Sequence, residues 1–232
     1  ENIRKIPQFI KRCVDREGCM EFDVSAVCAI VEYSSRTAER QDKLSTRFNH
    51  LAEILCEAVT WAKLEGAELV TAEHIQKTIY EKEQRMKLYE EKLDEMLEEN
   101  VIMIDTEGAE IGQINGLAVL DMGNYAFGNP SRITATTYVG KSGIVNIEKE
   151  ARLSGQTHDK GVQIITGFLG QTYAQNFPLS LSCRVCFEQN YNGIDGDSAS
   201  STELYCILSS LAELPIRQDL AVTGSVNQKG EI

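Results

Sequence analysis

A serine lies in a short polar loop, Asp195-Gly-Asp-Ser-Ala-Ser200, directly before an amphipathic segment that begins at Thr202. The N-terminus of a helix offers free N–H groups and a positive partial charge, and both would stabilise an alkoxide or an oxyanion. The small neighbours Gly196 and Ala199 leave room for the backbone of a substrate. Ser198 is therefore a candidate nucleophile. A serine before a helix is also a common N-cap, and both roles stay open at this point.

A nucleophilic serine needs a base. The chain has three histidines: His50 and His74 fall on predicted helical surfaces, and His158 falls in a predicted loop beside Asp159. A triad of Ser198 with His158 and Asp159 is one option, although adjacent residues are badly placed for the carboxylate to orient the ring. The other option is a lysine whose pKa is lowered by burial.

Two further patterns imitate nucleotide-binding motifs. Ala135–Ser142 satisfies a relaxed phosphate-loop pattern in which Ala replaces the first Gly. The residues that follow it, Gly143–Ile147, alternate like a strand, whereas a phosphate loop precedes a helix. We therefore reject an ATP site here and predict a hairpin turn at Val139–Gly143. Val101–Asp105 resembles a strand that ends in a magnesium-binding aspartate, but it precedes the supposed phosphate loop, which is the wrong order.

Cys183 and Cys186 form a C-x-x-C pair in a segment that alternates like a strand. Residues three apart in a strand point to opposite faces, and no second Cys or His pair lies nearby. We predict buried structural thiols and no metal site. The odd total of seven cysteines fits a reducing compartment, so we expect a cytoplasmic protein.

The composition limits the partners. Of the 232 residues, 23 are Lys or Arg and 35 are Asp or Glu, which gives a net charge of −12. Phosphate binding needs a basic stripe, so this balance argues against a nucleic-acid partner. No apolar run approaches the roughly 20 residues of a membrane helix. Because the chain begins with Glu1 and carries no signal peptide, we expect a fragment of a longer protein.

The glycines divide the chain: only Gly18 and Gly66 precede residue 100, and the other 15 of the 17 follow it. The first part has apolar residues at helical spacing, and the second has short alternating segments separated by Gly and Asn. We expect helices around residues 6–14, 24–31, 48–62, 73–99, 162–173 and 202–214, and strands at 101–104, 116–120, 132–138, 143–147 and 179–187. Asp23 and Thr71 are expected to begin helices. The predicted fold class is α + α/β, an all-helical part followed by a mixed α/β domain.

About residues 108–232 resemble the proteolytic domain of Lon proteases, particularly the B-type branch. The resemblance rests on ordered motifs: Gly112–Ala118, His158–Gly161, Phe187–Gln189, Asp195–Ser200, Leu214–Ile216, Ala221–Ser225 and Gly230-Glu231. It implies that Ser198 is the nucleophile and that Thr223 hydrogen-bonds the catalytic lysine. It also implies that Asp195, Gly196 and Asp197 form the active-site loop. In this family the general base is a lysine shortly beyond the Gly-Glu segment. We expect it after Ile232, so the chain would hold half of a Ser-Lys dyad in an incomplete protease domain.

Residues 1–72 resemble the helical lid of AAA+ Lon proteins, and Lys43–Arg47 resembles the helix start that carries the sensor-2 arginine. By this resemblance Arg47 approaches the ATP phosphates. ATP and magnesium are expected in the full-length protein, with their core motifs before Glu1, and no cofactor is expected in the proteolytic domain. The implied domains are the lid (1–72), a long connecting helix and linker (73–104), and the proteolytic domain (105–232).

The resemblance implies an ATP-dependent serine endopeptidase that degrades unfolded or regulatory proteins as a homo-hexamer, without nucleic acid or a membrane segment. Two alternatives remain. One is a non-proteolytic Lon-like scaffold or oligomerisation module. The other is a phosphate-binding domain similar to the small-metabolite kinases of the GHMP type, whose fold is similar. Against the kinase, Asp195 and Asp197 flank the single Gly196 and would repel a phosphate.

Overall fold

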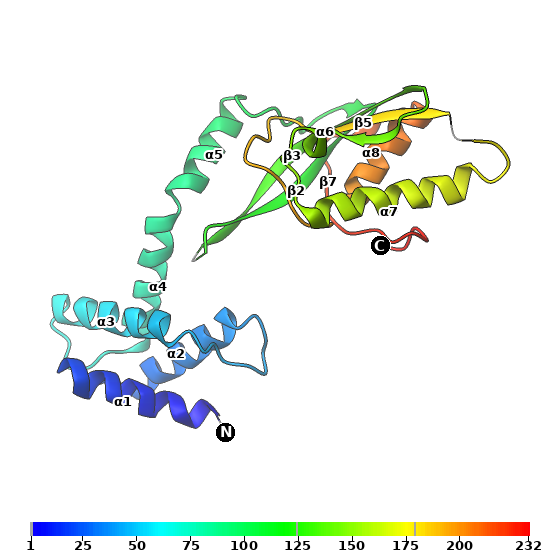
Figure 1. The fold of residues 1–232 in the computed structure, drawn as a ribbon. Helices are drawn as coiled ribbons and strands as arrows, with labels where there is room; N and C mark the ends of the chain where they lie inside the picture. The colour runs from blue at the N-terminus through cyan, green and yellow to red at the C-terminus, as the bar shows by residue number, and fades with distance from the viewer. Residues whose placement is uncertain (1, 124, 179) are drawn as a thin grey trace. The chain divides into compact units, whose positions relative to one another are not determined.

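The computed structural model describes residues 2–123, 125–178 and 180–232, and it contains two compact units, Glu1–Tyr89 and Glu90–Ile232. The elements of the first unit are η1 (Asn2–Lys5), α1 (Ile6–Glu17), α2 (Val24–Thr37), α3 (Phe48–Leu64) and α4 (Ala72–Met86), and α5 (Leu88–Glu98) leads into the second. The second unit continues with β1 (Ala109–Glu110), β2 (Gln113–Asp121), β3 (Ala126–Val139), β4 (Gly143–Asn146), α6 (Ile147–Glu150), α7 (Gln156–Tyr173), β5 (Leu181–Phe187), α8 (Ser200–Ala212), β6 (Ile216–Arg217) and β7 (Ala221–Val222). The predicted fold class, α + α/β, is confirmed (Figure 1).

The first unit is a helical cluster around one apolar core. Ile30, Leu51 and Ile75 from three different helices are fully buried in it. The expected helix starts are confirmed: the carboxylate of Asp23 accepts the amide of Ala26 at 2.8 Å, and Thr71 forms a capping box at the start of α4. Caps of this kind satisfy amides that the helix itself leaves unpaired.

The expected surface position of His74 is wrong, because this side chain is buried and is part of the Thr71 capping box. Its Nδ1 accepts the amide of Thr71 at 2.9 Å, and its Nε2 lies 3.3 Å from a carboxylate oxygen of Glu65. The helix expected over residues 73–99 is interrupted at Lys87, where α4 ends and α5 follows. No Gly or Pro in this segment explains the interruption.

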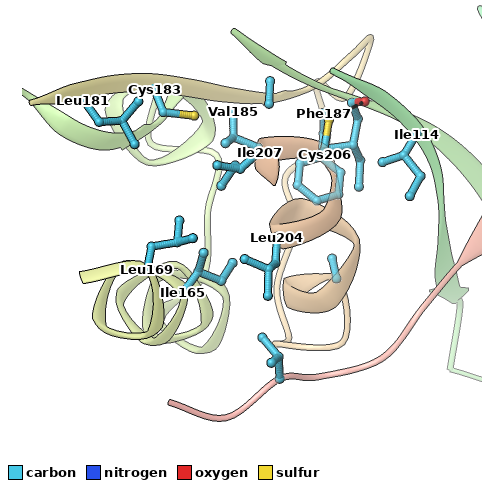
Figure 2. Packing of buried hydrophobic residues seen from close by; sticks show 14 residues of the cluster. Ile114, Ile165, Leu169, Leu181, Cys183, Val185, Phe187, Leu204, Cys206 and Ile207 are labelled. Atoms are coloured by element: carbon cyan, nitrogen blue, oxygen red, sulfur yellow. Dashed lines mark hydrogen bonds between the residues drawn. The ribbon is translucent and has the colours of Figure 1, made fainter. Parts of the chain in front are cut away.

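The second unit is built on a five-stranded sheet with the order β4-β5-β3-β2-β7 and a separate pair, β1 with β6. The pairs β2–β3 and β3–β5 are antiparallel, whereas β2–β7 and β4–β5 are parallel. Helices α7 and α8 bury their apolar faces together with one face of this sheet (Figure 2). Ile165 of α7, Ile207 of α8 and Val185 of β5 are almost fully buried there. This core fixes the start of α8, the place where the sequence puts its candidate serine.

Two strand expectations are wrong. Val101–Ile104 is not a strand, because its polar backbone groups bond a side chain: Met103 donates its amide to Gln189 Oε1 at 2.7 Å, and Gln189 Nε2 donates to the Val101 carbonyl at 2.9 Å. Val139 ends β3 and Gly143 begins β4, with a bend at residues 140–142 between them. This connection is not a hairpin, since β4 pairs with β5 and not with β3. Residue 179, the expected start of β5, lies outside the described residues.

Within the described ranges, no helix is both long enough and apolar enough to cross a membrane.

Candidate active site

Ser198 lies on the loop between β5 and α8, and its side chain is exposed. The N-cap residue of α8 is Ala199, and no side chain caps this helix. The serine therefore stands one residue before the cap and does not fill the N-cap role that the sequence left open. A hydroxyl that is exposed and not engaged as a cap is accessible to a substrate carbonyl.

The segment after β7 runs along this loop and holds it. The carbonyl of Ser198 accepts the amide of Gly224 at 2.6 Å and the hydroxyl of Thr223 at 3.3 Å. One turn further on, Ser201 donates its amide to the Gly224 carbonyl at 3.0 Å, and Ser200 Oγ accepts the amide of Val226 at 3.0 Å. Thr223, which the sequence associates with the dyad, thus lies against the residue proposed as the nucleophile.

Asp195 joins the loop to the N-terminus of α7. Its Oδ1 accepts three amides, from Thr157 at 3.1 Å, from His158 at 3.2 Å and from Gly196 at 2.8 Å. These bonds stabilise the charged form, so the amide of Gly196 first, and then that of His158, lower the pKa of this carboxyl. The close approach requires Gly155, where an added Cβ would lie 2.1 Å from Asp195 Cγ.

Gly196 and Asp197 complete the turn. Gly196 has a φ of +91°, which a residue with a side chain rarely adopts. Asp197 is half-buried, and its carbonyl accepts the amide of Ser200 at 3.0 Å. The structure therefore brings Asp195, Gly196, Asp197, Ser198 and Thr223 together at the start of α8.

His158 is not in a loop, as the sequence suggested, but in the first turn of α7, and only 1% of it is exposed. Its Nε2 lies 3.5 Å from Glu203 Oε1 in the first turn of α8. Asp159 faces elsewhere: its Oδ1 accepts the hydroxyl of Ser154 at 2.6 Å, and its Oδ2 lies 3.6 Å from the Lys149 ammonium. The carboxylate near the ring of His158 is thus Glu203 and not Asp159, contrary to the triad option.

Sequence reasoning missed Glu203. An acidic residue in the first turn of a helix is usually a solvent-exposed partner of the helix dipole, so its type and position gave no sign of burial. Thr202 and Leu204 on either side are also buried, which shows that the first turn of α8 is enclosed on all sides. Only the packing of α7, β2, β3 and β5 against α8 reveals it.

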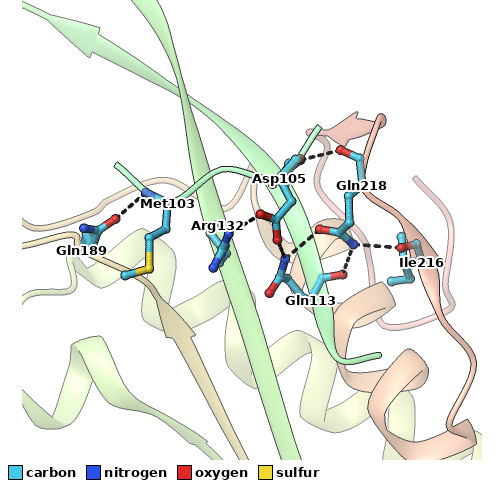
Figure 3. A network of polar contacts seen from close by, with 8 residues as sticks. Met103, Asp105, Gln113, Arg132, Gln189, Ile216 and Gln218 are labelled. Atoms are coloured by element: carbon cyan, nitrogen blue, oxygen red, sulfur yellow. Dashed lines mark hydrogen bonds and ion pairs between the residues drawn. The ribbon is translucent and has the colours of Figure 1, made fainter. Parts of the chain in front are cut away.

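A polar network fixes the segment that enters the second unit (Figure 3). Asp105, which imitates a magnesium ligand in the sequence, lies 2.9 Å from the guanidinium of Arg132 and accepts Gln113 Nε2 at 2.6 Å. Gln113 Nε2 also donates to the buried Gln218 at 3.0 Å. The carboxylate is thus engaged by protein groups.

Comparison with known proteins identifies the chain. The model of the archaeal LonB AAA+ ATPase lid domain matches residues 21–85. A Lon protease homologue of Escherichia coli (strain K12) is 38% identical over 172 residues, which are 73% of this chain and 29% of that protein. A Lon protease homologue of Haemophilus influenzae is 33% identical over 222 residues, 93% of this chain and 36% of that protein. The archaeal Lon protease of Pyrococcus abyssi is 30% identical over 251 aligned positions, 100% of this chain and 23% of that protein.

The chain belongs to the Lon protease family. Its lid matches the archaeal branch, as the resemblance to B-type Lon implied. The chain spans about a third, or less, of the length of these Lon relatives. The activity and partners of a whole Lon protein are therefore matters for proposal.

In the Lon lid, Arg47 is exposed and stands at the N-cap position of α3. Its neighbours on both sides, Thr46 and Phe48, line a groove together with η1 and α1, and the charged side chains of that groove are Lys5, Arg12, Lys43 and Asp42. Arg47 itself is not among the residues that line this groove, so its approach to ATP phosphates stays a prediction.

The Lon-type second unit has its C-x-x-C pair on β5. Burial raises the pKa of the Cys183 thiol, and that of Cys186, to about 12, so both are protonated at neutral pH. Cys183 is buried, whereas Cys186 is only partly buried, and protonated thiols are poor nucleophiles.

Proposed function

We propose that this chain is part of an ATP-dependent serine endopeptidase of the Lon family, with Ser198 as the nucleophile. The observation that carries the proposal is the placement of an exposed serine one residue before the N-cap of α8, in a loop held by Asp195 and by the segment after β7. Membership of the Lon family supports it.

In the proposed reaction, Ser198 Oγ attacks the carbonyl carbon of the scissile peptide. Its proton passes to a lysine amine, which we expect in the longer protein beyond Ile232, and then to the leaving amine. The peptide C–N bond breaks and leaves an ester on Ser198. Water, deprotonated by the same amine, then hydrolyses the ester and restores the serine.

The developing oxyanion is proposed to lie at the positive end of α8. Two amides of this end are already engaged, because Ser200 donates to the Asp197 carbonyl and Ser201 to the Gly224 carbonyl. The donors to the oxyanion therefore have to come from the loop itself, at Ser198 and Ala199. Thr223, which now bonds the Ser198 carbonyl, is proposed to support the lysine.

The remaining roles are proposals for the whole protein. ATP, bound with magnesium, would supply the free energy for unfolding and threading, and Arg47 would contribute positive charge near its phosphates. The substrates would be unfolded or regulatory proteins, the assembly a homo-hexamer and the compartment the cytoplasm. No nucleic acid is required. Among the residues that the structure describes, no specific contact favours the kinase-like or the scaffold alternative.

The test is casein degradation by the full-length protein with ATP and magnesium. We expect Ser198→Ala to lower the rate by at least a hundredfold. The matched control is Ser142→Ala, which changes an exposed serine in the phosphate-loop imitation between β3 and β4. It should leave the rate unchanged. Equal rates for Ser198→Ala and the unaltered protein would overturn the nucleophile assignment, and no degradation by either would favour the scaffold.

A further inference from the structure

Two ionisable side chains are buried against each other beneath the Ser198 loop. His158 of α7 and Glu203 of α8 are each 1% exposed, and His158 Nε2 lies 3.5 Å from Glu203 Oε1. The imidazole also meets the ring of Phe187 edge-on, with 5.4 Å between the centroids. The pair therefore joins the first turns of two helices and the end of β5.

The pair has few other polar partners. Among the described residues, neither carboxylate oxygen of Glu203 has a hydrogen bond, and His158 Nε2 has none either, although it lies close to Glu203 Oε1. A bare carboxylate is very unfavourable in such a place, so the group retains a proton. Burial first, with the nearby Glu148 adding to it, raises the pKa of Glu203 to about 8.

Burial lowers the pKa of His158, so its ring is less easily protonated than in water. Asp159, the backbone of Gly196 and Asp195 act in the opposite direction and are outweighed. The buried thiol of Cys206 is a further ionisable group near the pair, and Glu203 contributes to the raised pKa of this thiol. The groups around the pair are thus acids and a protonated thiol. One proton on the pair keeps its total charge at zero.

The pair contacts the nucleophile loop on both sides of Ser198. The backbone amide of His158 donates to Asp195 Oδ1 at 3.2 Å, three residues before the serine. Glu203 donates its own amide to the carbonyl of Ala199, the residue after the serine, at 2.9 Å. A shift of either side chain would therefore be transmitted to the loop.

Building on the proposed function, we propose that His158 and Glu203 are positioning residues for Ser198. The pair carries one acidic proton, on the Glu203 carboxyl that faces His158 Nε2, and in that state the two residues hold Asp195 and Ala199 in place on either side of the nucleophile. Loss of the proton at alkaline pH leaves a buried carboxylate facing a neutral ring with no proton between them. The contact then weakens, and the loop loses its support.

The first test compares peptide cleavage by the full-length protein and two variants from pH 6 to 9. Glu203→Gln mimics the protonated acid, so its kcat at pH 7 should stay within threefold of the value of the unaltered protein. The kcat of the unaltered protein should decline above pH 8, and that of Glu203→Gln should not. Glu203→Leu removes the polar partner, and kcat should fall at least tenfold with KM within twofold. The matched control is His74→Gln, a buried histidine beside a carboxylate in the other unit. It should leave the pH profile unchanged.

Identical pH profiles of the unaltered protein and Glu203→Gln would overturn the proposal, as would an unchanged kcat in Glu203→Leu. A second measurement needs no activity and serves if Glu203→Leu does not fold. Since the folded pKa of Glu203 lies above its ordinary value of 4.5, its stabilising contribution is complete below pH 4.5 and is lost as pH rises through about 8.

In thermal unfolding of the inactive Ser198→Ala protein, adding Glu203→Gln should therefore remove a fall in melting temperature between pH 5 and 8. Equal melting curves with Gln and Glu at position 203 would contradict the retained proton on Glu203, even if Ser198 is the nucleophile. Conversely, Glu203→Gln could remove the fall in melting temperature while cleavage does not depend on Ser198. This result would refute the proposed function and leave the pair as a structural feature.

Discussion

The one-residue offset between Ser198 and the N-cap of α8 separates two roles that a serine can have at a helix start. A capping serine accepts an amide of the first turn, and this removes its hydroxyl from chemistry. Here Ala199 is at the cap, and the amides of Ser200 and Ser201 bond to carbonyls. The sequence alone left both roles open, because a shift of one residue in the start of a helix is below what spacing can resolve.

At the same scale, Asp195 should stabilise the fold through the start of α7. Asp195→Ala removes the acceptor of three amides, so we expect a lower melting temperature at pH 7. Asp195→Asn keeps an acceptor oxygen, so its melting temperature should fall less. The pKa of Asp195 is below its ordinary value of 3.8, so its contribution is present above pH 3.8 and is lost as pH falls through the folded pKa.

Thermal unfolding between pH 2 and 7 measures this effect. The difference in melting temperature between Asp195→Ala and the unaltered protein should become smaller at acidic pH. Asp197→Ala, a control in the same loop, should differ less from the unaltered protein at pH 7. A difference that is constant across this pH range would show that the carboxylate charge of Asp195 contributes nothing.

Histidines show what residue type alone cannot predict. The sequence predicts a surface position for His74 and a loop position for His158. Both side chains are buried, each beside a glutamate. Polar residues are buried when a specific partner is available, and the partners here come from another turn of the chain or another helix. Neither Glu65 nor Glu203 is near its histidine in a way that sequence spacing reveals.

At the scale of elements, the fit between α7 and the active-site loop depends on Gly155. Its φ of −81° is open to alanine, but the added Cβ would displace the Asp195 side chain. We expect Gly155→Ala to destabilise the protein by about 1–3 kcal/mol and to lower peptidase activity.

The matched control is Gly170→Ala in the same helix, where nothing lies within 4 Å of an added Cβ. It should stabilise the protein by about 0.5–1 kcal/mol, because alanine is the better helix former. Denaturant unfolding of both variants measures the difference. Equal effects of the two substitutions would show that the contact between Gly155 and Asp195 is unimportant.

The amphipathic helices and the alternating strands were predictable because their periodicity reflects burial within each element. What failed depended on partners distant in sequence. In Val101–Ile104, the backbone of Val101 and Met103 forms hydrogen bonds with the side chain of Gln189, where a strand would bond the backbone of a neighbouring strand. The pairing of β4 with β5 places a third strand between two consecutive ones, which no local turn signal encodes.

At the scale of the molecule, the uneven distribution of glycines predicted the change from helices to a mixed sheet, and each unit encloses its own core. The ordered motifs identified the family, because several short segments in the right order are far more specific than one serine loop. The limits of the domains at residues 72 and 104 remain predictions. The sequence could not predict that Asp195, Ser198 and Thr223 lie together around the start of α8, because these residues meet only through the packing of α7, α8 and β7.

The most direct measurement is a crystal structure of the full-length protein with a peptide boronic acid, which forms a tetrahedral adduct with a reactive serine. We predict a covalent bond between boron and Ser198 Oγ, with a boronate oxygen directed to the loop amides at the start of α8. A boronate bonded to another residue, or bound at this loop without a covalent bond, would contradict the assignment of Ser198 as the nucleophile.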